Sequence, residues 1–434
     1  MGLKFQLSDN VRLDAIRRLC ELLGNPQERF HSVHIAGSKG KGSTAATVEA
    51  MARAAGYRTG LFTSPHLVSP RERIRLDGEM ISRDDLTRLV DTVKPPIEAI
   101  RAENGPLPPS FFEAYTAMAF LAFADANVDL AVLETGLGGR FDATNIITPV
   151  ACAITRIDLE HTDLLGDTVE QIAFEKTGII KPDVPVVVAD NSPQVMEVIQ
   201  EVADRRGATV LPAPRVISTE PPERLQVPDV AGPPPQMTQT VVLEHEGGLL
   251  QVEYGLLGRH QAHNLAVAVG LADVLASLGF DRLDEEAMVA GARQVEWPAR
   301  FEIVGTRPWM VLDCAHNPSS AIVLATSLGE LLEYERLIVV LGVSQDKDVV
   351  GIAEALAPMT DVAVLTQADM PRALQVPEFE AATGHLWRKY RTAPTTLDAM
   401  TVACDMAGPH DCIVITGSFF VLDEYLRLVN QATV

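Results

Sequence analysis

The feature that most limits the fold of this chain is an apolar stretch, residues 31–36, that runs into a glycine-rich loop and then into a helix-forming segment. The loop reads Gly37-Ser38-Lys39-Gly40-Lys41-Gly42-Ser43. Its three glycines let backbone N–H groups approach a phosphate closely, and a helix N-terminus favours negative charge. The order predicts a nucleotide-binding loop in which Lys41 lies against the β and γ phosphates. A plain glycine-rich turn is the weaker interpretation.

The loop differs from the common phosphate-binding loop at Gly42, where a Ser or Thr normally reaches Mg²⁺. The hydroxyl must then come from Ser43 or from another segment. Ser64 ends the next predicted strand, so its side chain would face the same crevice. A simple turn residue before Pro65 is an equally good interpretation of Ser64.

Short apolar strands alternate with longer helices on both sides of Trp297-Pro298-Ala299-Arg300. This alternation is typical of α/β domains with mainly parallel sheets. We predict an ATP-binding domain over residues 1–297 and a smaller, doubly wound Rossmann-like domain over 298–434. Strands are expected at 31–36, 130–134, 151–155 and 185–189, and again at 309–313, 337–341, 362–366 and 412–416, with a helix at 44–55. The proline-dense stretch, about 211–240, cannot be a helix and is expected to be an excursion or linker on the first domain.

The net charge and the spacing of the cysteines exclude several classes of function and location. A net charge of −22 repels nucleic acid and anionic membranes, so an anionic substrate must be held by local groups. Five cysteines without a Cys-x-x-Cys pair indicate free thiols in a reducing compartment. The N-terminus lacks the apolar stretch of a signal peptide, and the longest apolar run, near 114–124, is too short to span a bilayer. We expect a cytoplasmic protein with neither a nucleic-acid nor a membrane partner and, without a heptad seam, a monomer.

Polar side chains follow two further predicted strands. Glu134 ends an apolar strand, where its carboxylate could bind Mg²⁺, and a loop rich in Gly, Arg, Asp and Asn follows at 136–145. His161 comes after the next strand, where a neutral imidazole could coordinate a cation. A lone histidine is usually structural, and a simple turn is the rival interpretation of the loop. Lys176 lies between a helix and a turn, where a solvated charge is the usual outcome.

Together these segments resemble the folylpolyglutamate synthase and dihydrofolate synthase family, which is related to the Mur cell-wall ligases. The resemblance extends over nearly the whole chain. The matching segments, in chain order, are 37–43, 63–67 with Arg71-Glu72-Arg73-Ile74, Phe111-Phe112-Glu113, 134–145, 161–166, Glu175-Lys176, 260–264, Arg300-Phe301 and Asp313-Cys314-Ala315-His316-Asn317-Pro318.

The resemblance implies a Mur-ligase-like fold and a set of site residues. It implies that Ser64, Glu134 and His161 bind one Mg²⁺, and that a carbamylated Lys176 serves a second. It leaves room for a monovalent cation as well. It also implies that Asn264, Arg300 and Asp313 contact ATP together with the loop 37–43, and that His316 lies close by as a catalytic group beside Lys41 and Lys176.

The folate pocket is assigned by the same resemblance to Phe112, Phe141, Asp142 and Ala143. An aromatic face and a carboxylate suit a flat heterocycle, although core packing is a serious rival interpretation of Phe112. The chain departs from the family pattern at two positions. Glu160 replaces an Asp before the histidine and preserves its charge, whereas Cys314 replaces a Gly and puts a Cβ at a tight turn.

The implied reaction is ATP-dependent ligation of L-glutamate to a dihydropteroate or reduced folate carboxylate through an acyl phosphate. One or both acceptors could be used, and a bifunctional enzyme that uses both is favoured. His316 or neighbouring donors would stabilise the tetrahedral intermediate. A Mur-type ligase acting on another substrate is the nearest rival, but it would need a domain of roughly 100 residues before the loop. A nucleotide-binding regulator without catalysis is a second rival. The retained residues Ser64, Glu134, His161 and Lys176 argue against it.

Overall fold

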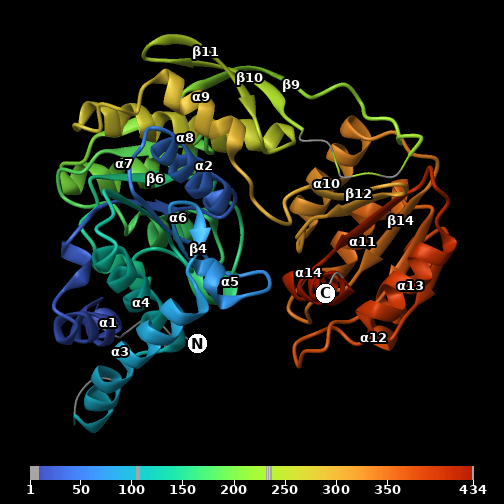
Figure 1. Cartoon of the computed structure of the whole chain (residues 1–434), viewed down its shortest axis with the longest axis horizontal. Helices are drawn as coiled ribbons and strands as arrows, with labels where there is room; N and C mark the ends of the chain where they lie inside the picture. The colour runs from blue at the N-terminus through green and yellow to red at the C-terminus, as the bar shows by residue number, and fades with distance from the viewer. Residues whose placement is uncertain (1–8, 104–107, 231, 233, 235–236, 433–434) are drawn as a thin grey trace.

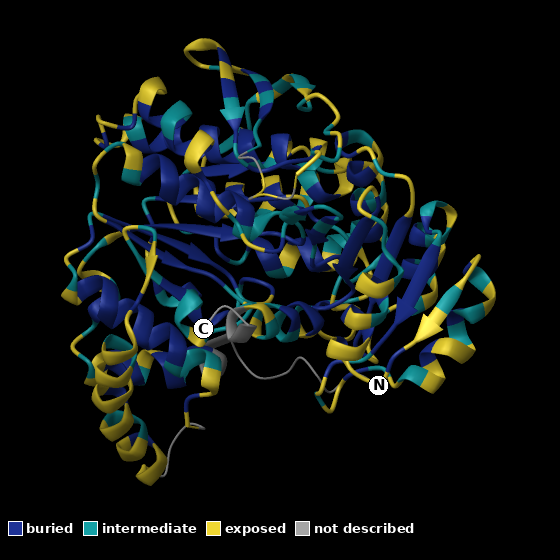
Figure 2. Cartoon of the chain, turned by 45° about the vertical axis from the view of Figure 1, so that its right-hand side comes forward, coloured by how far each residue is buried: buried dark blue, intermediate teal, exposed yellow. Residues whose placement is uncertain are grey.

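The computed structural model of the chain describes residues 9–103, 108–230, 232, 234 and 237–432. The chain forms two lobes, each with its own sheet (Figure 1). The central strands of both sheets are buried, whereas the edge strand β4 is exposed, and most other exposed residues lie on helices and loops (Figure 2). Within these described ranges, no helix is both long enough and apolar enough to cross a membrane.

The larger lobe contains an eight-stranded sheet in the order β4-β3-β2-β5-β1-β6-β7-β8. The six strands from β2 to β8 run parallel, and β3 pairs antiparallel with both β2 and β4 at one edge. The strands are β1 (His31–Ala36), β2 (Thr59–Phe62), β3 (Ile74–Leu76), β4 (Glu79–Met80), β5 (Leu130–Glu134), β6 (Ala151–Ile154), β7 (Val186–Val188) and β8 (Val210–Pro212).

Helices cover both faces of this sheet because successive side chains of each strand point to opposite sides. Val33, Ile35 and Val132 pack beneath α2 (Lys41–Ala54), α8 (Arg259–Ser277) and α9 (Glu285–Gln294). The alternate residues of the strands face the other helices. These are α1 (Asp9–Leu22), α3 (Arg83–Ala102), α4 (Phe111–Asp125), α6 (Val169–Thr177) and α7 (Pro193–Arg206), with the short α5 (Thr162–Leu165) leading into α6.

The smaller lobe has a six-stranded sheet in the order β12-β13-β17-β14-β15-β16, parallel except for β12 at its edge. Its strands are β12 (Glu302–Thr306), β13 (Trp309–Leu312), β14 (Leu337–Leu341), β15 (Val362–Leu365), β16 (Tyr390–Thr392) and β17 (Cys412–Thr416). Its helices are α10 (Pro318–Leu331), α11 (Val349–Leu356), α12 (Val376–Thr383), α13 (Thr396–Met406) and α14 (Phe419–Ala432). The predicted α/β class, with a mainly parallel sheet and a second α/β lobe, is confirmed.

The proline-dense stretch reaches further than predicted. It begins with β8 and β9 (Arg215–Glu220) and ends in β10 (Gln239–His245), which pairs with β11 (Gly248–Tyr254) in a three-stranded antiparallel sheet. Between these strands, Leu225 forms a β-bridge to Leu332 of the smaller lobe, and the backbone N–H of Gly232 donates to Thr306 Oγ1 at 3.2 Å. The stretch therefore contacts the second lobe as well as the first, and the boundary at 297/298 stays a prediction.

Candidate functional site

The glycine-rich loop joins the end of β1 to the start of α2 and is fixed by the end of β6. The backbone N–H groups of Ser38 and Lys39 donate to Arg156 O at 2.9 and 3.1 Å. Thr155 Oγ1 donates to Lys39 O at 2.7 Å, and Ser38 Oγ donates to Asp158 O at 2.9 Å. Because β1 and β6 are parallel neighbours, this anchor presents the loop at the carboxyl edge of the sheet, where ligands of such folds bind.

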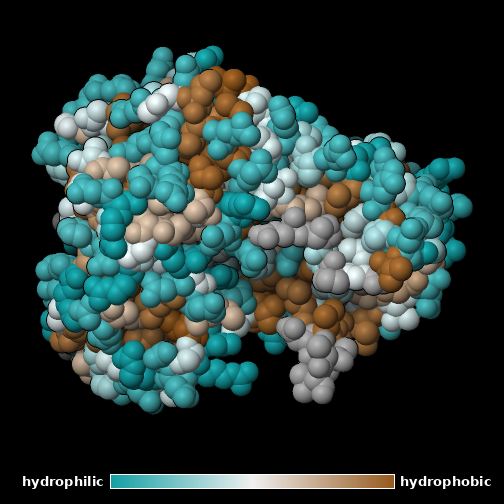
Figure 3. Space-filling view, turned by 45° about the horizontal axis from the view of Figure 1, so that its top comes forward, coloured by the Kyte–Doolittle hydropathy of each residue, from teal (hydrophilic) through white to brown (hydrophobic). Residues whose placement is uncertain are grey.

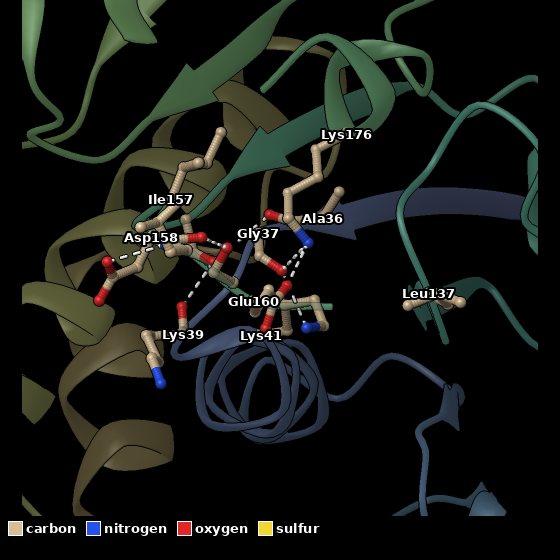
Figure 4. Close-up of polar contacts among 12 residues, drawn as sticks. Ala36, Gly37, Lys39, Lys41, Leu137, Ile157, Asp158, Glu160 and Lys176 are labelled. Atoms are coloured by element: carbon tan, nitrogen blue, oxygen red, sulfur yellow. Dashed lines mark hydrogen bonds and ion pairs between the residues drawn. The ribbon is translucent and has the colours of Figure 1, made fainter. Parts of the chain in front are cut away.

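Two lysine ammonium groups converge on one carbonyl of this loop. Lys41 Nζ donates to Gly37 O at 2.9 Å, and Lys176 Nζ, from the last turn of α6, donates to the same oxygen at 2.7 Å (Figure 4). The side chain of Lys39 points to the other side of the loop (Figure 4). Lys176 is 1 % exposed, so its interpretation as a solvated helix-end charge is wrong. The pair concentrates positive charge where the predicted γ-phosphate would lie.

Glu160 completes this charge cluster. Lys176 Nζ lies 2.6 Å from Glu160 Oε1. Burial opposes ionisation of the carboxyl, but Lys41 and Lys176 together hold the pKa of Glu160 below its usual range. Burial, reinforced by the charge of Lys41, lowers the pKa of Lys176 to about 8. About a tenth of this amine is therefore neutral at pH 7, far more than for an ordinary lysine.

The predicted metal ligands lie at neighbouring strand ends. Glu134 ends β5, is 5 % exposed and accepts a hydrogen bond from the backbone N–H of Ser64 at 3.1 Å. Burial raises the pKa of Glu134, and no described residue forms an ion pair with it. A buried carboxylate without an ion-pair partner fits a divalent cation. Burial lowers the pKa of His161, which favours the neutral imidazole that binds metals.

The predicted metal ligands do not form a cluster built only from His, Cys, Asp and Glu. In the part of the chain that the structure describes, no three such side chains are arranged to hold a metal ion. The predicted set of metal ligands contains only two residues of these types, Glu134 and His161. Its other members are the Ser64 hydroxyl and Lys176, which would bind a metal only after carbamylation. The metal assignment stays a prediction.

A cavity of about 810 Å³ opens beside these residues. Ser64 and His161 form part of its lining, so it reaches the predicted metal ligands. All four residues assigned to the folate pocket line it: Phe112, Phe141, Asp142 and Ala143. Its volume is in the range of pockets that enclose small organic ligands.

The aromatic residues of the cavity have two kinds of contact. The ring of Phe112 lies 5.9 Å from that of Phe62 and is only half-buried, so it packs on the core and faces the cavity as well. Phe141 lies under the guanidinium of Arg140 at 4.2 Å, and Arg140 Nη2 lies 2.7 Å from Glu175 Oε1. Core packing and a binding role are therefore compatible at Phe112.

Several lining residues were given no individual role by the sequence, most notably Arg73, which belongs to a segment that matches the family pattern. Its Nε donates to His66 Nδ1 at 2.8 Å, and its guanidinium lies 5.7 Å from the rings of Phe111 and Tyr115. The available signal was the family match of the segment Arg71-Glu72-Arg73-Ile74. Ser110, Glu113, Asp163 and Glu175 also line the cavity.

Three of the predicted site residues, Arg300, Asp313 and His316, belong to the smaller lobe or its start. The charge of Arg300 acts on Glu134 and on Lys39, so this guanidinium lies near the glycine-rich loop. Asp313 accepts from the backbone N–H groups of Phe301 and Ala315, both at 2.9 Å, which fixes the turn after β13. Burial lowers the pKa of His316 to about 4. Its Nδ1 lies 2.9 Å from Cys314 O and must donate to that carbonyl. Hydrophobic residues line the recess between the lobes (Figure 3).

The Cβ of Cys314 is accommodated without a left-handed backbone. The residues with positive φ in this region are Ala299 at 58° and Phe301 at 49°, not Cys314. Cys314 is fully buried, and its N–H donates to Ala299 O at 3.1 Å. The departure from glycine therefore leaves the turn intact, and the strained backbone lies at Ala299 and Phe301 instead.

Asn264, near the N-terminus of α8, contacts the loop directly. A Cβ at Gly40, whose φ is 83°, would lie 2.0 Å from Asn264 Oδ1. We expect Gly40→Ala to raise the KM for ATP at least about tenfold, because left-handed backbone costs alanine about 1–2 kcal/mol and the side chain displaces Asn264. Steady-state kinetics with varied ATP check this. Gly24→Ala is the control, since φ there is 77° but no atom lies within 4 Å; equal KM values in the two variants would contradict the expectation.

Comparison with known sequence families and proteins gives consistent matches. The family described as "Mur ligase middle domain" matches residues 35–272, and "Mur ligase, glutamate ligase domain" matches residues 299–419. A dihydrofolate synthase/folylpolyglutamate synthase of Mycobacterium tuberculosis is 39% identical over 94% of this chain and 87% of its own length. The "Probable bifunctional folylpolyglutamate synthase/dihydropteroate synthase" of Haloferax volcanii is 38% identical over 99% of this chain, which spans 50% of that relative.

Solved structures agree over nearly the whole chain. Folylpolyglutamate synthase of Mycobacterium tuberculosis complexed with ADP has a TM-score of 0.87 and 37% identity, covering 98% of this chain and 95% of that one. E. coli FolC in complex with DHPP and ADP has a TM-score of 0.81 and 26% identity, covering 100% and 96%. The similarity includes both lobes.

Proposed function

This chain belongs to the folylpolyglutamate synthase and dihydrofolate synthase family of Mur ligases, which are ATP-dependent ligases, and on that premise we propose that it joins L-glutamate to a folate-type carboxylate. The observation that carries the proposal is the meeting of two features at the edge of the larger sheet. The glycine-rich loop, with Lys41 and Lys176 on one carbonyl, lies beside an 810 Å³ cavity lined by Phe112 and Phe141. A triphosphate and a flat acid would meet there.

The loop 37–43, with Asn264, Arg300 and Asp313, would hold ATP. Ser64, Glu134 and His161 would hold one Mg²⁺, and a carbamate on Lys176 would serve a second, with room for a monovalent cation. Bound Mg²⁺ supplies charge neutralisation for the transferred phosphoryl group. Carbamylation forms an N–C bond between the neutral amine of Lys176 and CO₂ with loss of a proton. The lowered pKa of Lys176, about 8, supports it because the neutral amine is the reacting form.

The proposed reaction has two steps. An oxygen of the acceptor carboxylate attacks the γ-phosphorus of ATP, and ADP leaves, giving an acyl phosphate. The amine of glutamate then attacks the acyl carbon, and phosphate leaves as the amide forms. Lys41 would neutralise charge on the transferred phosphoryl group, and closure of the two lobes would exclude water from the acyl phosphate. The protein supplies no nucleophile in this scheme.

His316 would act on the second step in its neutral form. With a pKa of about 4, its ring carries no charge at neutral pH, and its Nδ1–H donates to Cys314 O. Its Nε2 therefore presents a lone pair that can accept a hydrogen bond from the amine of glutamate and so orient it for attack. A ring with a pKa of about 4 is too weak a base to keep the proton that the amine loses, and this proton leaves with the phosphate. The expected role, in which His316 or a neighbouring donor stabilises the tetrahedral intermediate, would need a proton on Nε2 if His316 were the donor.

The acceptor is tested by a direct assay. Purified protein with ATP, Mg²⁺ and labelled glutamate receives dihydropteroate or tetrahydrofolate separately, and products are resolved by mass. We expect glutamylated product from both, as for a bifunctional enzyme. A Mur-type ligase on another substrate would yield product from neither, and a nucleotide-binding regulator would show no ATP hydrolysis dependent on acceptor and glutamate.

The proposal also covers the cellular compartment, the oligomeric state and the partners of the enzyme. We propose a cytoplasmic monomer whose partners are ATP, L-glutamate and the pterin acceptor, without nucleic acid or membrane. The five cysteines are free thiols, four of them buried, which agrees with a reducing compartment.

A further inference from the structure

A histidine lies buried in the middle of the central strand of the larger sheet. His34 in β1 is 0 % exposed and lies between β5 and β6, opposite Leu133 and Cys152. Burial, with a smaller effect of the Lys181 charge, lowers its pKa to about 3, so the imidazole is neutral at working pH. The proposed reaction does not use it. A buried polar group in a sheet needs a reason, because its desolvation is costly.

The hydrogen bond between His34 and Thr144 has a definite direction. His34 Nε2 lies 2.7 Å from Thr144 Oγ1, and that hydroxyl lies 2.5 Å from Asp142 Oδ1. A carboxylate only accepts, so the single hydroxyl proton of Thr144 goes to Asp142. Thr144 must then accept from His34, which fixes the tautomer with its proton on Nε2. His34 Nδ1 has no partner among the described residues.

Asp142 uses both oxygens to close the loop that lines the acceptor cavity. Its Oδ2 accepts from the backbone N–H groups of Gly136 and Leu137 at 2.8 and 2.9 Å. Its Oδ1 accepts from Thr144 through both the hydroxyl and the backbone N–H, the latter at 3.0 Å. Four donors occupy the four lone-pair positions of the carboxylate. Asp142 is therefore committed to loop structure in this state.

The closed loop also fixes an aromatic wall of the cavity. A Cβ at Gly136 would lie 2.5 Å from Phe112 Cζ, so the backbone at Gly136 is in close contact with that ring. The chain of contacts runs from His34, three residues before the glycine loop, through Thr144 and Asp142 to Phe112. It links the strand that carries the phosphate loop to the wall of the acceptor cavity.

We propose that His34 and Thr144 are positioning residues for acceptor binding: the imidazole orients the Thr144 hydroxyl, which holds Asp142 in the geometry that closes loop 136–142. The inference rests on the proposed function, in that the acceptor occupies this cavity. Neither residue contacts the acceptor or ATP in it. Loss of the relay loosens the acceptor wall while leaving the nucleotide loop, which is anchored by Thr155 and Arg156, in place.

The test compares Thr144→Val, which keeps the shape and loses the hydroxyl, with Thr144→Ser, which keeps the hydroxyl. We expect Thr144→Val to raise the KM for the pterin acceptor at least about tenfold, because buried partners are left unsatisfied, with the KM for ATP within about twofold. Thr144→Ser is expected within about twofold of wild type in both. A merely structural role would give both variants the same loss or raise both KM values together, and either result would overturn the proposal.

A second measurement does not depend on activity. Hydrogen exchange by mass spectrometry is followed in peptides covering 136–142 and 37–44 of the full chain. We expect faster exchange at 136–142 in Thr144→Val alone, with 37–44 unchanged; unaltered exchange at 136–142 would overturn the relay. Wild-type protein that glutamylates no pterin acceptor would count against the proposed function, and the exchange result would still decide the relay.

Discussion

Replacing Lys41 with alanine is expected to lower turnover at least about a hundredfold, the effect of removing one donor that stabilises developing charge. Lys41 Nζ lies at the phosphate end of the glycine loop, 2.9 Å from Gly37 O, and would move from that carbonyl to the transferred phosphoryl group. The chain as a whole is strongly acidic, so this local charge has no substitute in the long-range field. Steady-state turnover at saturating ATP measures the effect.

The control for Lys41 is the same substitution at an exposed lysine. Lys94 lies on the solvent side of α3, and Lys94→Ala should leave turnover unchanged. Thermal unfolding of both variants separates lost chemistry from lost fold. Turnover of Lys41→Ala near that of the wild type would remove this lysine from the mechanism.

Lys176→Ala is expected to lower turnover by a similar factor, at least about a hundredfold, if its carbamate serves a metal. A short carboxylate such as propionate should then restore part of the activity, because it can occupy the position of the missing carbamate. Lys181→Ala is the matched control: Lys181 is half-buried and also has a pKa of about 8, but it donates to Asn145 O. If propionate restored activity to neither Lys176→Ala nor Lys181→Ala, or to both equally, the assignment of a metal-binding carbamate to Lys176 would be contradicted.

The carbamate itself has a pH dependence with a definite sign. Burial lowers the pKa of Lys176 to about 8, so about half of the amine is neutral at pH 8 and less at lower pH. With ¹³C-bicarbonate and Mg²⁺, the carbamate signal in ¹³C NMR should rise between about pH 7 and 9 and be absent from Lys176→Ala. A signal that is the same in both proteins would show that it comes from elsewhere.

Local patterns in the sequence predicted the parts of the site that local chemistry determines. The strand at 31–36, the loop after it and the strand 130–134 ending at Glu134 lie as predicted. Parallel strands bring their carboxyl ends to one edge, so polar residues after each strand meet without further information. All four residues assigned to the folate pocket line one cavity, but the family resemblance assigned them, and Phe112 begins α4 instead of following a strand.

What local patterns could not predict depends on contacts between distant residues. Lys176 is in the last turn of a helix, where lysines are usually solvated, and its burial follows from packing against Gly37. The proline-dense stretch reaches the second lobe through Leu225, which composition alone does not reveal. Asp142 satisfies four protein donors, a role visible only once Gly136, Leu137 and Thr144 surround it.

The central claim is that the acceptor carboxylate takes the γ-phosphoryl group of ATP before glutamate attacks. An acceptor labelled with ¹⁸O in its carboxylate tests this directly, because one of its oxygens must leave with phosphate when the amide forms. Mass analysis of the phosphate released during a complete turnover should find one oxygen from the acceptor in each molecule. Phosphate without that label, alongside normal amide formation, would contradict an acyl phosphate.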